Sequence, residues 1–348
     1  MDIPTHALTS FALARGFFPR RGWPIIVGML IAGSVADIDQ LSVFFGPAAY
    51  LAAHRNWTHS ILATVFVVAI AAAVTFYLGK TKAIPLRTIL AAAALAAAAH
   101  ILMDLFQSAG ETLLWPFRAT RFAADYLPRI DPWILALLLA GILLPELFRL
   151  VSSEIGAKDK TPRGRNGALI ALALIVVYIS ARGVLHGQAT DALDAHSYRG
   201  ESPRRLGAFP APISLFAWHG IAETQSLVCL AEVPVHSARE FDAEAANCQH
   251  KPEFSPALDM AQKTVAAENF LQSARFPRAT VEKTQDGYEV TIRSLRDIVE
   301  QETHSVAARI VLDAKPRVFS EELVWAKEPK LRLCGANSKL AGAAFCAG

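Results

Sequence analysis

The stretch AHRNWTHSILATVFVVAIAAAVTFYL, residues 53–78, decides the fold because a polar segment runs directly into a long apolar one. No residue from Ile61 to Leu78 is charged, and this run is 18 residues long. An apolar helix of about 20 residues spans the roughly 30 Å hydrocarbon core of a bilayer. We therefore predict a transmembrane helix, with His54, Arg55 and His59 just before its N-terminal end.

Four other stretches of this kind lie before residue 190, and hydrophobic residues make up 53% of the 348-residue chain, which is high for a soluble protein. We predict an all-α multi-pass membrane domain over residues 1–190. Its expected helices are 4–18, 24–45, 60–79, 84–106, 132–150 and 168–185. We expect no cleavable signal, because apolar sequence begins at Ile3 without a basic region before it.

Basic residues gather in alternate connections between these helices. The richer connections hold Arg15, Arg20, Arg21, Lys80, Lys82, Arg87, Arg149, Lys158, Lys160, Arg163 and Arg165, and the others hold Arg55, Arg118, Arg121 and Arg129. Lys and Arg mark cytoplasmic loops, so residues 53–60 are predicted at the outer face of the inner membrane. The net charge of +3 comes with no basic stripe, which argues against nucleic acid as a partner.

Residues 191–348 have mixed polar composition and are predicted to form an extracytoplasmic, β-rich (α+β) domain. SLVCLAEVPV, GYEVTIRSL and SVAARIVLDA alternate apolar and polar residues, as half-buried strands do. All four cysteines lie here, which predicts disulfides in an exported domain. Three pairings are open, and short loops favour Cys229–Cys248 with Cys334–Cys346. A zinc site is the alternative, although no CxxC pair is present.

Ionisable residues within the apolar half are the candidates for function, because each costs about 2.5–3.5 kcal/mol near the middle of a membrane. They are His6, Asp37, Asp39, His54, His59, His100 and Asp104. His59 stands 21 residues before Lys80, and His100 stands 18 residues after Lys82. Counted from the basic turns at about 1.5 Å per residue, separate segments deliver these side chains to one outer layer.

The spacing of these residues indicates a metal site. His100 and Asp104 are at i and i+4, on one helix face. Asp37 and Asp39 share a side only if their helix has ended or unwound. Imidazole with carboxylate suits zinc, manganese, iron or nickel, and bridging carboxylates suit a pair of ions. We predict one or two divalent ions held by His6, Asp37, Asp39, His59, His100 and Asp104.

Each polar residue also has a purely structural interpretation. Asp37 or Asp39 suits a helix cap, and His6 suits the membrane interface. Asp131 before Pro132 is predicted to cap a helix rather than to bind a metal. Thr58 and Ser60 are expected to open the helix that follows.

The motifs MDIPTHALTSFAL, ADID, HRNWTHS, HILMDLFQSAGETLLWPF and RIDPW, in this order, resemble the YdjM-like family of membrane-bound metal-dependent hydrolases over about residues 1–190. FPAPISLFAWHGI and VTIRSLRDI are similar to the extracytoplasmic part of longer members. Ala36 stands where the family commonly has proline. The resemblance implies a helical membrane domain, metal-dependent hydrolysis and the His/Asp set named above.

The predicted chemistry is metal-assisted hydrolysis, in which a divalent ion lowers the pKa of water to about 7. His6 and His54 are expected as acid and base where they are not ligands, and Arg55 as the group that binds a phosphate or carboxylate. The expected substrate is a membrane lipid or a lipid-linked ester or phosphoester. The alternatives are a metal-binding or ion-conducting membrane protein without hydrolysis, and a scaffold whose exported domain is the active part.

Overall fold

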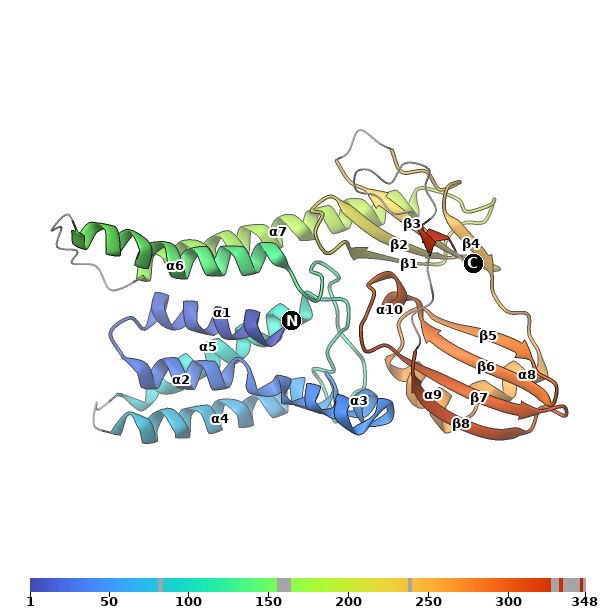
Figure 1. The fold of residues 1–348 in the computed structure, drawn as a ribbon, viewed down its shortest axis with the longest axis horizontal. Helices are drawn as coiled ribbons and strands as arrows, with labels where there is room; N and C mark the ends of the chain where they lie inside the picture. The colour runs from blue at the N-terminus through green and yellow to red at the C-terminus, as the bar shows by residue number, and fades with distance from the viewer. Residues whose placement is uncertain (81–83, 155–163, 237–239, 327–331, 334–344, 347–348) are drawn as a thin grey trace. The chain divides into compact units, whose positions relative to one another are not determined.

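The structure is a computed structural model that describes residues 1–80, 84–154, 164–236, 240–326, 332–333 and 345–346 (Figure 1). The chain divides into two compact units. One contains residues 1–40 and 53–182, and the other contains residues 41–52 and 183–348. The boundary expected after residue 190 falls within one long helix, α7 (Arg165–Asp194).

The first unit is helical, which confirms the predicted fold class of the N-terminal half. Its main helices are α1 (Ile3–Phe17), α2 (Trp23–Ala32), η1 (Val35–Phe45), α4 (Ile61–Leu78), α5 (Leu86–Leu105), α6 (Pro132–Glu154) and the first part of α7. Two short helices lie between η1 and α4 along the chain: α3 (Pro47–Ala53), which belongs with the end of η1 to the second unit, and η2 (Trp57–His59), which belongs to the first.

Four helices are long and apolar enough to cross a membrane, namely α4, α5, α6 and α7. A fifth crossing is formed if α2 and η1, which meet at a bend of 46°, count as one span. The predicted first span forms the helix α1, but its 15 residues are too few for an upright crossing. The count of six crossings is therefore not confirmed, whereas a multi-pass helical domain is.

The break between α2 and η1 lies at Gly33. The helix ends at Ala32, which leaves the Gly33 carbonyl without an intrahelical partner, and His100 Nδ1 donates to it over 3.0 Å. A Cβ atom at Gly33 would lie 2.0 Å from Ser10 Oγ, so glycine permits the close approach of α1. The unwound backbone that Asp37 and Asp39 require is thus present, since both lie in the 3₁₀ helix η1.

Small residues let the helices of this unit approach one another. α1, α2, α4 and α5 lie side by side (Figure 1). Ala71 of α4 and Ala93, Ala96 and Ala97 of α5 are all buried in their shared core. Alanine permits close approach of helix backbones in a membrane, as the alanine run of α5 predicts.

The second unit contains two four-stranded antiparallel sheets, which confirms the β-rich C-terminal half. The first sheet has the order β1 (Arg205–Pro210), β2 (Ala217–Glu223), β3 (Leu227–Pro234) and β4 (Asn247–His250). The second has the order β5 (Pro277–Lys283), β6 (Gly287–Ser294), β7 (Val306–Asp313) and β8 (Val318–Trp325). Strands β9 (Arg332–Leu333) and β10 (Phe345–Cys346) pair with each other.

Three short helices also belong to the second unit: α8 (Pro256–Gln262), α9 (Val265–Ser273) and α10 (Leu295–Val299). α8 and α9 bury Leu258 and Phe270 against Val290 and Ile310 of the second sheet. Another apolar cluster joins Phe209 and Ile221 of the first sheet to residues that follow α9, so both sheets belong to one folded body.

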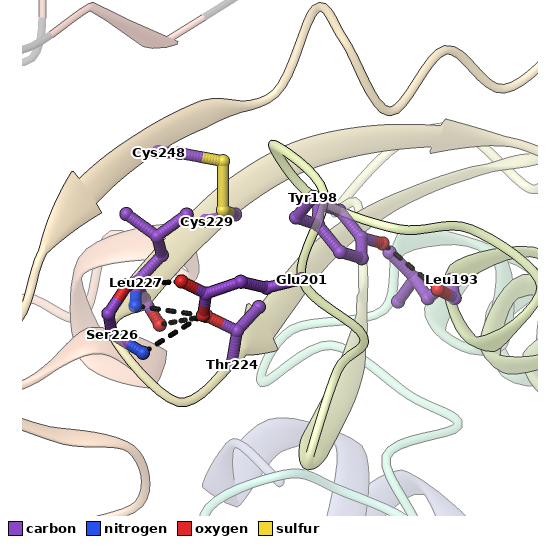
Figure 2. Close-up of a disulfide and its surroundings, with 8 residues drawn as sticks. All are labelled: Leu193, Tyr198, Glu201, Thr224, Ser226, Leu227, Cys229 and Cys248. Atoms are coloured by element: carbon purple, nitrogen blue, oxygen red, sulfur yellow. Dashed lines mark hydrogen bonds between the residues drawn. A yellow bond between two sulfur atoms is a disulfide. The ribbon is translucent and has the colours of Figure 1, made fainter.

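A disulfide links β3 to β4, between Cys229 and Cys248, which face each other directly across the two strands (Figure 2). This confirms the first predicted pair. Cys334, half of the second predicted pair, lies outside the described residues. Beside the disulfide, Glu201 accepts hydrogen bonds from Ser226 and Thr224, and these hold the pKa of its carboxyl down at about 2 (Figure 2).

Candidate metal centre

Four segments of the helical unit bring the predicted site residues into one buried cluster. α1 supplies His6, η1 supplies Asp37 and Asp39, the segment before α4 supplies Arg55 and His59, and α5 supplies His100 and Asp104. Each of these seven residues is at most 6% exposed. His54 lies at the edge of the cluster, with a side chain that is 19% exposed.

His6, Asp37, His100 and Asp104 form a group of four possible ligands. Each offers one nitrogen or oxygen, and these atoms all lie within 4.8 Å of one another. His6 Nε2 is 3.2 Å from Asp104 Oδ1 and 3.9 Å from Asp37 Oδ2. His100 Nε2 is 3.4 Å from Asp104 Oδ2, so the predicted i, i+4 pair does share a helix face.

The orientation of His100 suits metal binding. Its Nδ1 donates to the Gly33 carbonyl, so the lone pair is on Nε2, which faces Asp104. Metal-binding histidines usually donate their other ring nitrogen to a carbonyl or carboxylate in this way. The break after α2 therefore orients a ring on α5.

Asp39 is differently placed from Asp37, although both were predicted as ligands. Asp39 Oδ2 accepts from the Arg55 backbone N–H (2.9 Å) and from the Thr58 hydroxyl (2.5 Å). Its Oδ1 lies 3.1 Å from His54 Nδ1. Among the described residues Asp39 is in no group of possible metal ligands. The geometry supports a role in holding the segment before α4.

Arg55 points inward rather than toward solvent. Its Nη2 donates to Asp104 Oδ1 (3.2 Å) and Gln107 Oε1 (2.5 Å), and its Nη1 lies 3.4 Å from Glu111 Oε1. Its backbone has a φ of 55°, in the left-handed region that is uncommon for a residue other than glycine. The predicted anion-binding role of Arg55 stays a prediction.

Glu111 is a buried member of the cluster that sequence reasoning missed. It is fully buried, and with His59 and Asp104 it forms a second group of possible ligands within 4.8 Å. It follows α5 in the motif HILMDLFQSAGETLLWPF. The polar residues Gln107 and Glu111 of this motif were the signal that could have indicated Glu111 as a site residue.

The structural interpretations hold for Asp131 and Ser60 but not for Thr58. Asp131 Oδ1 accepts from the backbone N–H groups of Trp133 and Ile134, so it caps α6 as predicted. Ser60 caps α4 through the N–H of Ala63. Thr58 donates to Asp39 rather than opening the helix.

The cluster is rich in buried negative charge. Asp37, Asp39, Asp104 and Glu111 are carboxylates, and within the described part of the chain they face Arg55 and the amino group of Met1, which contacts Asp104. Burial raises the pKa of the Glu111 carboxyl. Burial lowers the pKa of His59, but Glu111, Asp37 and Asp39 outweigh it and raise this pKa to about 9. The surroundings of His59 therefore favour a cation.

Several buried atoms of the cluster have no hydrogen-bond partner among the described residues. They are His6 Nδ1, Asp37 Oδ2, His59 Nε2, His100 Nε2, Asp104 Oδ2 and both carboxylate oxygens of Glu111, with Arg55 Nη1. Buried polar atoms are nearly always satisfied, because leaving one unpaired costs about 1–3 kcal/mol. Nitrogen and oxygen lone pairs that converge in this way fit a divalent transition metal ion.

Comparisons with known proteins agree with the helical half of this description. The model of the YdjM inner membrane protein family matches residues 1–189, more than half of the chain. The uncharacterized protein YfhP of Bacillus subtilis (strain 168) is 29% identical over 152 residues, which are 41% of this chain and 46% of that protein. The match thus spans under half the length of this relative. No solved structure matches.

Proposed function

The chain belongs to the YdjM inner membrane protein family, and from the buried cluster of its helical domain we propose that it is a metal-dependent hydrolase. One observation carries the proposal. Imidazole and carboxylate atoms from α1, η1 and α5 converge in a membrane domain, and Asp37 Oδ2, His100 Nε2 and Asp104 Oδ2 lack hydrogen-bond partners among the described residues. Ionisable groups at such positions are costly and are usually kept for function.

The residues that would hold a divalent ion, zinc, manganese or a similar metal, are His6, Asp37, His100 and Asp104. When bound, such an ion supplies a Lewis acid and lowers the pKa of water to about 7. The surrounding chain keeps bulk water away, because the ligand side chains are buried.

His54 and Arg55 are the proposed partners in the reaction. His54 is the most exposed residue of the predicted set, and Asp39 orients its ring through Nδ1. Its Nε2 is then the atom that accepts or returns a proton. Arg55 supplies a planar set of donors that suits the oxygens of a phosphate or carboxylate.

The proposed substrate is amphiphilic: a lipid, or a lipid-linked ester or phosphoester. The cluster lies in a domain of apolar helices, so a substrate that partitions into the bilayer has the most direct access. The distribution of Lys and Arg favours the outer face of the membrane for this chemistry, with the β-rich domain also outside.

The test is hydrolysis by the full chain, purified in mild detergent and supplied with Zn²⁺ or Mn²⁺. We expect release of fatty acid or phosphate from bilayer lipids or lipid-linked precursors, detected by mass spectrometry. His100→Gln abolishes it, and the control Glu146→Gln, which alters an ion pair with Arg15 elsewhere in this domain, does not. Bound metal without hydrolysis of any such substrate would favour the non-catalytic metal-binding or ion-conducting alternative.

A further inference from the structure

Asp37 and Asp104 lie between two histidines, with different oxygens toward each. Asp104 Oδ1 is 3.2 Å from His6 Nε2, and its Oδ2 is 3.5 Å from His59 Nε2. Asp37 repeats the pattern, with Oδ2 at 3.9 Å from His6 Nε2 and Oδ1 at 3.6 Å from His59 Nε2. Carboxylates that present one oxygen to each of two imidazoles have the arrangement of bridging ligands.

Glu111 adds a donor on the His59 side of the cluster. Its Oε2 is 4.0 Å from His59 Nδ1, and neither oxygen has a hydrogen-bond partner among the described residues. Its backbone is fixed, because Glu111 and Phe122 exchange two hydrogen bonds of 2.9 Å. The side chain is therefore held in the interior, where an uncompensated carboxylate is costly.

Arg55 alone does not compensate this carboxylate. Its Nη2 is engaged by Asp104 and Gln107, and its Nη1 approaches Glu111 only to 3.4 Å without forming a hydrogen bond. Arg55 thus serves two carboxylates, of which Asp104 is also contacted by the amino group of Met1. A second metal ion would satisfy three groups together: the oxygens of Glu111, His59 Nε2 and Asp104 Oδ2.

We propose that the centre is dinuclear, with a second divalent ion held by His59 and Glu111 and with Asp104 shared between the two ions. This inference rests on the proposed function, which supplies the first ion at His6, Asp37 and His100. Two-metal sites place both ions about 3.5–4 Å apart and act on both the attacking and the leaving oxygen of a displacement. A dinuclear centre favours a phosphoester as the substrate of this site.

Metal stoichiometry tests this inference separately from hydrolysis. The full chain in detergent is stripped with a chelator, titrated with Mn²⁺, and followed by elemental analysis and electron paramagnetic resonance. We expect about two equivalents per chain, with the spin-coupled spectrum of a manganese pair. Glu111→Gln, which keeps the side-chain shape, lowers the content to about one equivalent with the six-line spectrum of an isolated ion.

The outcomes of this titration distinguish a failure of the dinuclear centre from a failure of the proposed function. About one equivalent in the wild-type chain, or no spin coupling at two, overturns the dinuclear centre and leaves the proposed hydrolase standing. No bound metal overturns both. Glu146→Gln serves as the control that keeps both ions. If Glu111→Gln does not fold, the stoichiometry and spectrum of the wild-type chain decide alone.

Discussion

At the residue scale, Asp104 is the point on which the cluster depends. It lies within 3.5 Å of His6, Arg55, His59 and His100, which come from two other segments and from its own helix. Its burial is complete, so these neighbours rather than water must stabilise its charge. One carboxylate at the end of α5 therefore joins the segments on which the proposed site is built.

Arg55 yields a prediction that separates substrate binding from metal binding. Arg55→Lys keeps a positive charge near Asp104 but loses the planar guanidinium, whose N–H donors can bind two oxygens at once. We expect metal content to stay unchanged while KM for an anionic lipid substrate rises about 10-fold, equivalent to the loss of about 1.4 kcal/mol. Metal analysis and steady-state kinetics check this. Loss of metal in Arg55→Lys would mean that Arg55 only holds the ligands in place.

At the element scale, the break between α2 and η1 links packing to the site. The end of α2 exposes the Gly33 carbonyl to His100, and the 3₁₀ helix that follows carries both aspartates inward. The close contact of Gly33 with Ser10 joins this break to α1, the helix that carries His6. Three of the segments that supply ligands therefore depend on one backbone position.

Gly33→Ala tests this dependence. The added methyl meets Ser10 Oγ, so the Ser10 side chain or α1 must shift, and overpacking of this kind costs about 1–3 kcal/mol. We expect a lower unfolding temperature in detergent and weaker metal binding, with partial recovery in Gly33→Ala/Ser10→Ala. Gly187→Ala in α7 is the matched control, because nothing lies within 4 Å of its added methyl. Equal metal affinity in Gly33→Ala and Gly187→Ala would contradict the link.

The helices and the sharing of a face by His100 and Asp104 were predictable because they depend on local composition and spacing. The hydrogen bonds of Asp39 were not predictable, since its oxygens meet His54, Arg55 and Thr58 only after the chain has turned, and its place among the metal ligands stays a prediction. Glu111 was missed because its position depends on pairing with Phe122 across an irregular loop. No periodic pattern in a sequence signals such a contact.

The sheet domain offers a pH-dependent prediction. Burial lowers the pKa of His219 in β2 to about 4, whereas an unfolded histidine titrates at about 6.5. Between these values the unfolded state binds more protons, so the stability from neutral His219 is complete above pH 6.5 and is lost as pH falls toward 4. Hydrogen exchange of β1–β3 peptides should show wild-type protection falling from pH 7 to pH 5, relative to His219→Gln at each pH. A constant difference between the two chains would refute this.

At the scale of the whole molecule, the helical and β-rich units imply a protein with one part in the bilayer and one in water. The basic connections predict that the connection containing Lys160 is cytoplasmic and that the β-rich domain is outside. The Cys229–Cys248 disulfide suits an oxidising compartment. The orientation matters for the proposed function, because it would decide which leaflet supplies a lipid substrate.

Reporter fusions test this orientation. We expect a fusion near Lys160 to be active only as a cytoplasmic reporter, and one after Gly348 only as an exported reporter. Fusions at Glu111, in the connection after α5, should also report the outer face. A cytoplasmic signal after Gly348 would reverse the topology and place the cluster at the inner leaflet.

The central claim is that the buried histidines and carboxylates bind a divalent metal ion, and X-ray absorption spectroscopy of the zinc-loaded full chain tests it most directly. The account predicts a shell of nitrogen and oxygen at about 2.0–2.2 Å with the outer scattering of imidazole and no sulfur. Asp104→Asn should weaken zinc binding by more than about 100-fold, because losing even an outer partner of a ligand costs about 10–100-fold. A zinc–sulfur shell at about 2.3 Å would assign the metal to cysteines. That result, or no bound zinc, would contradict the account.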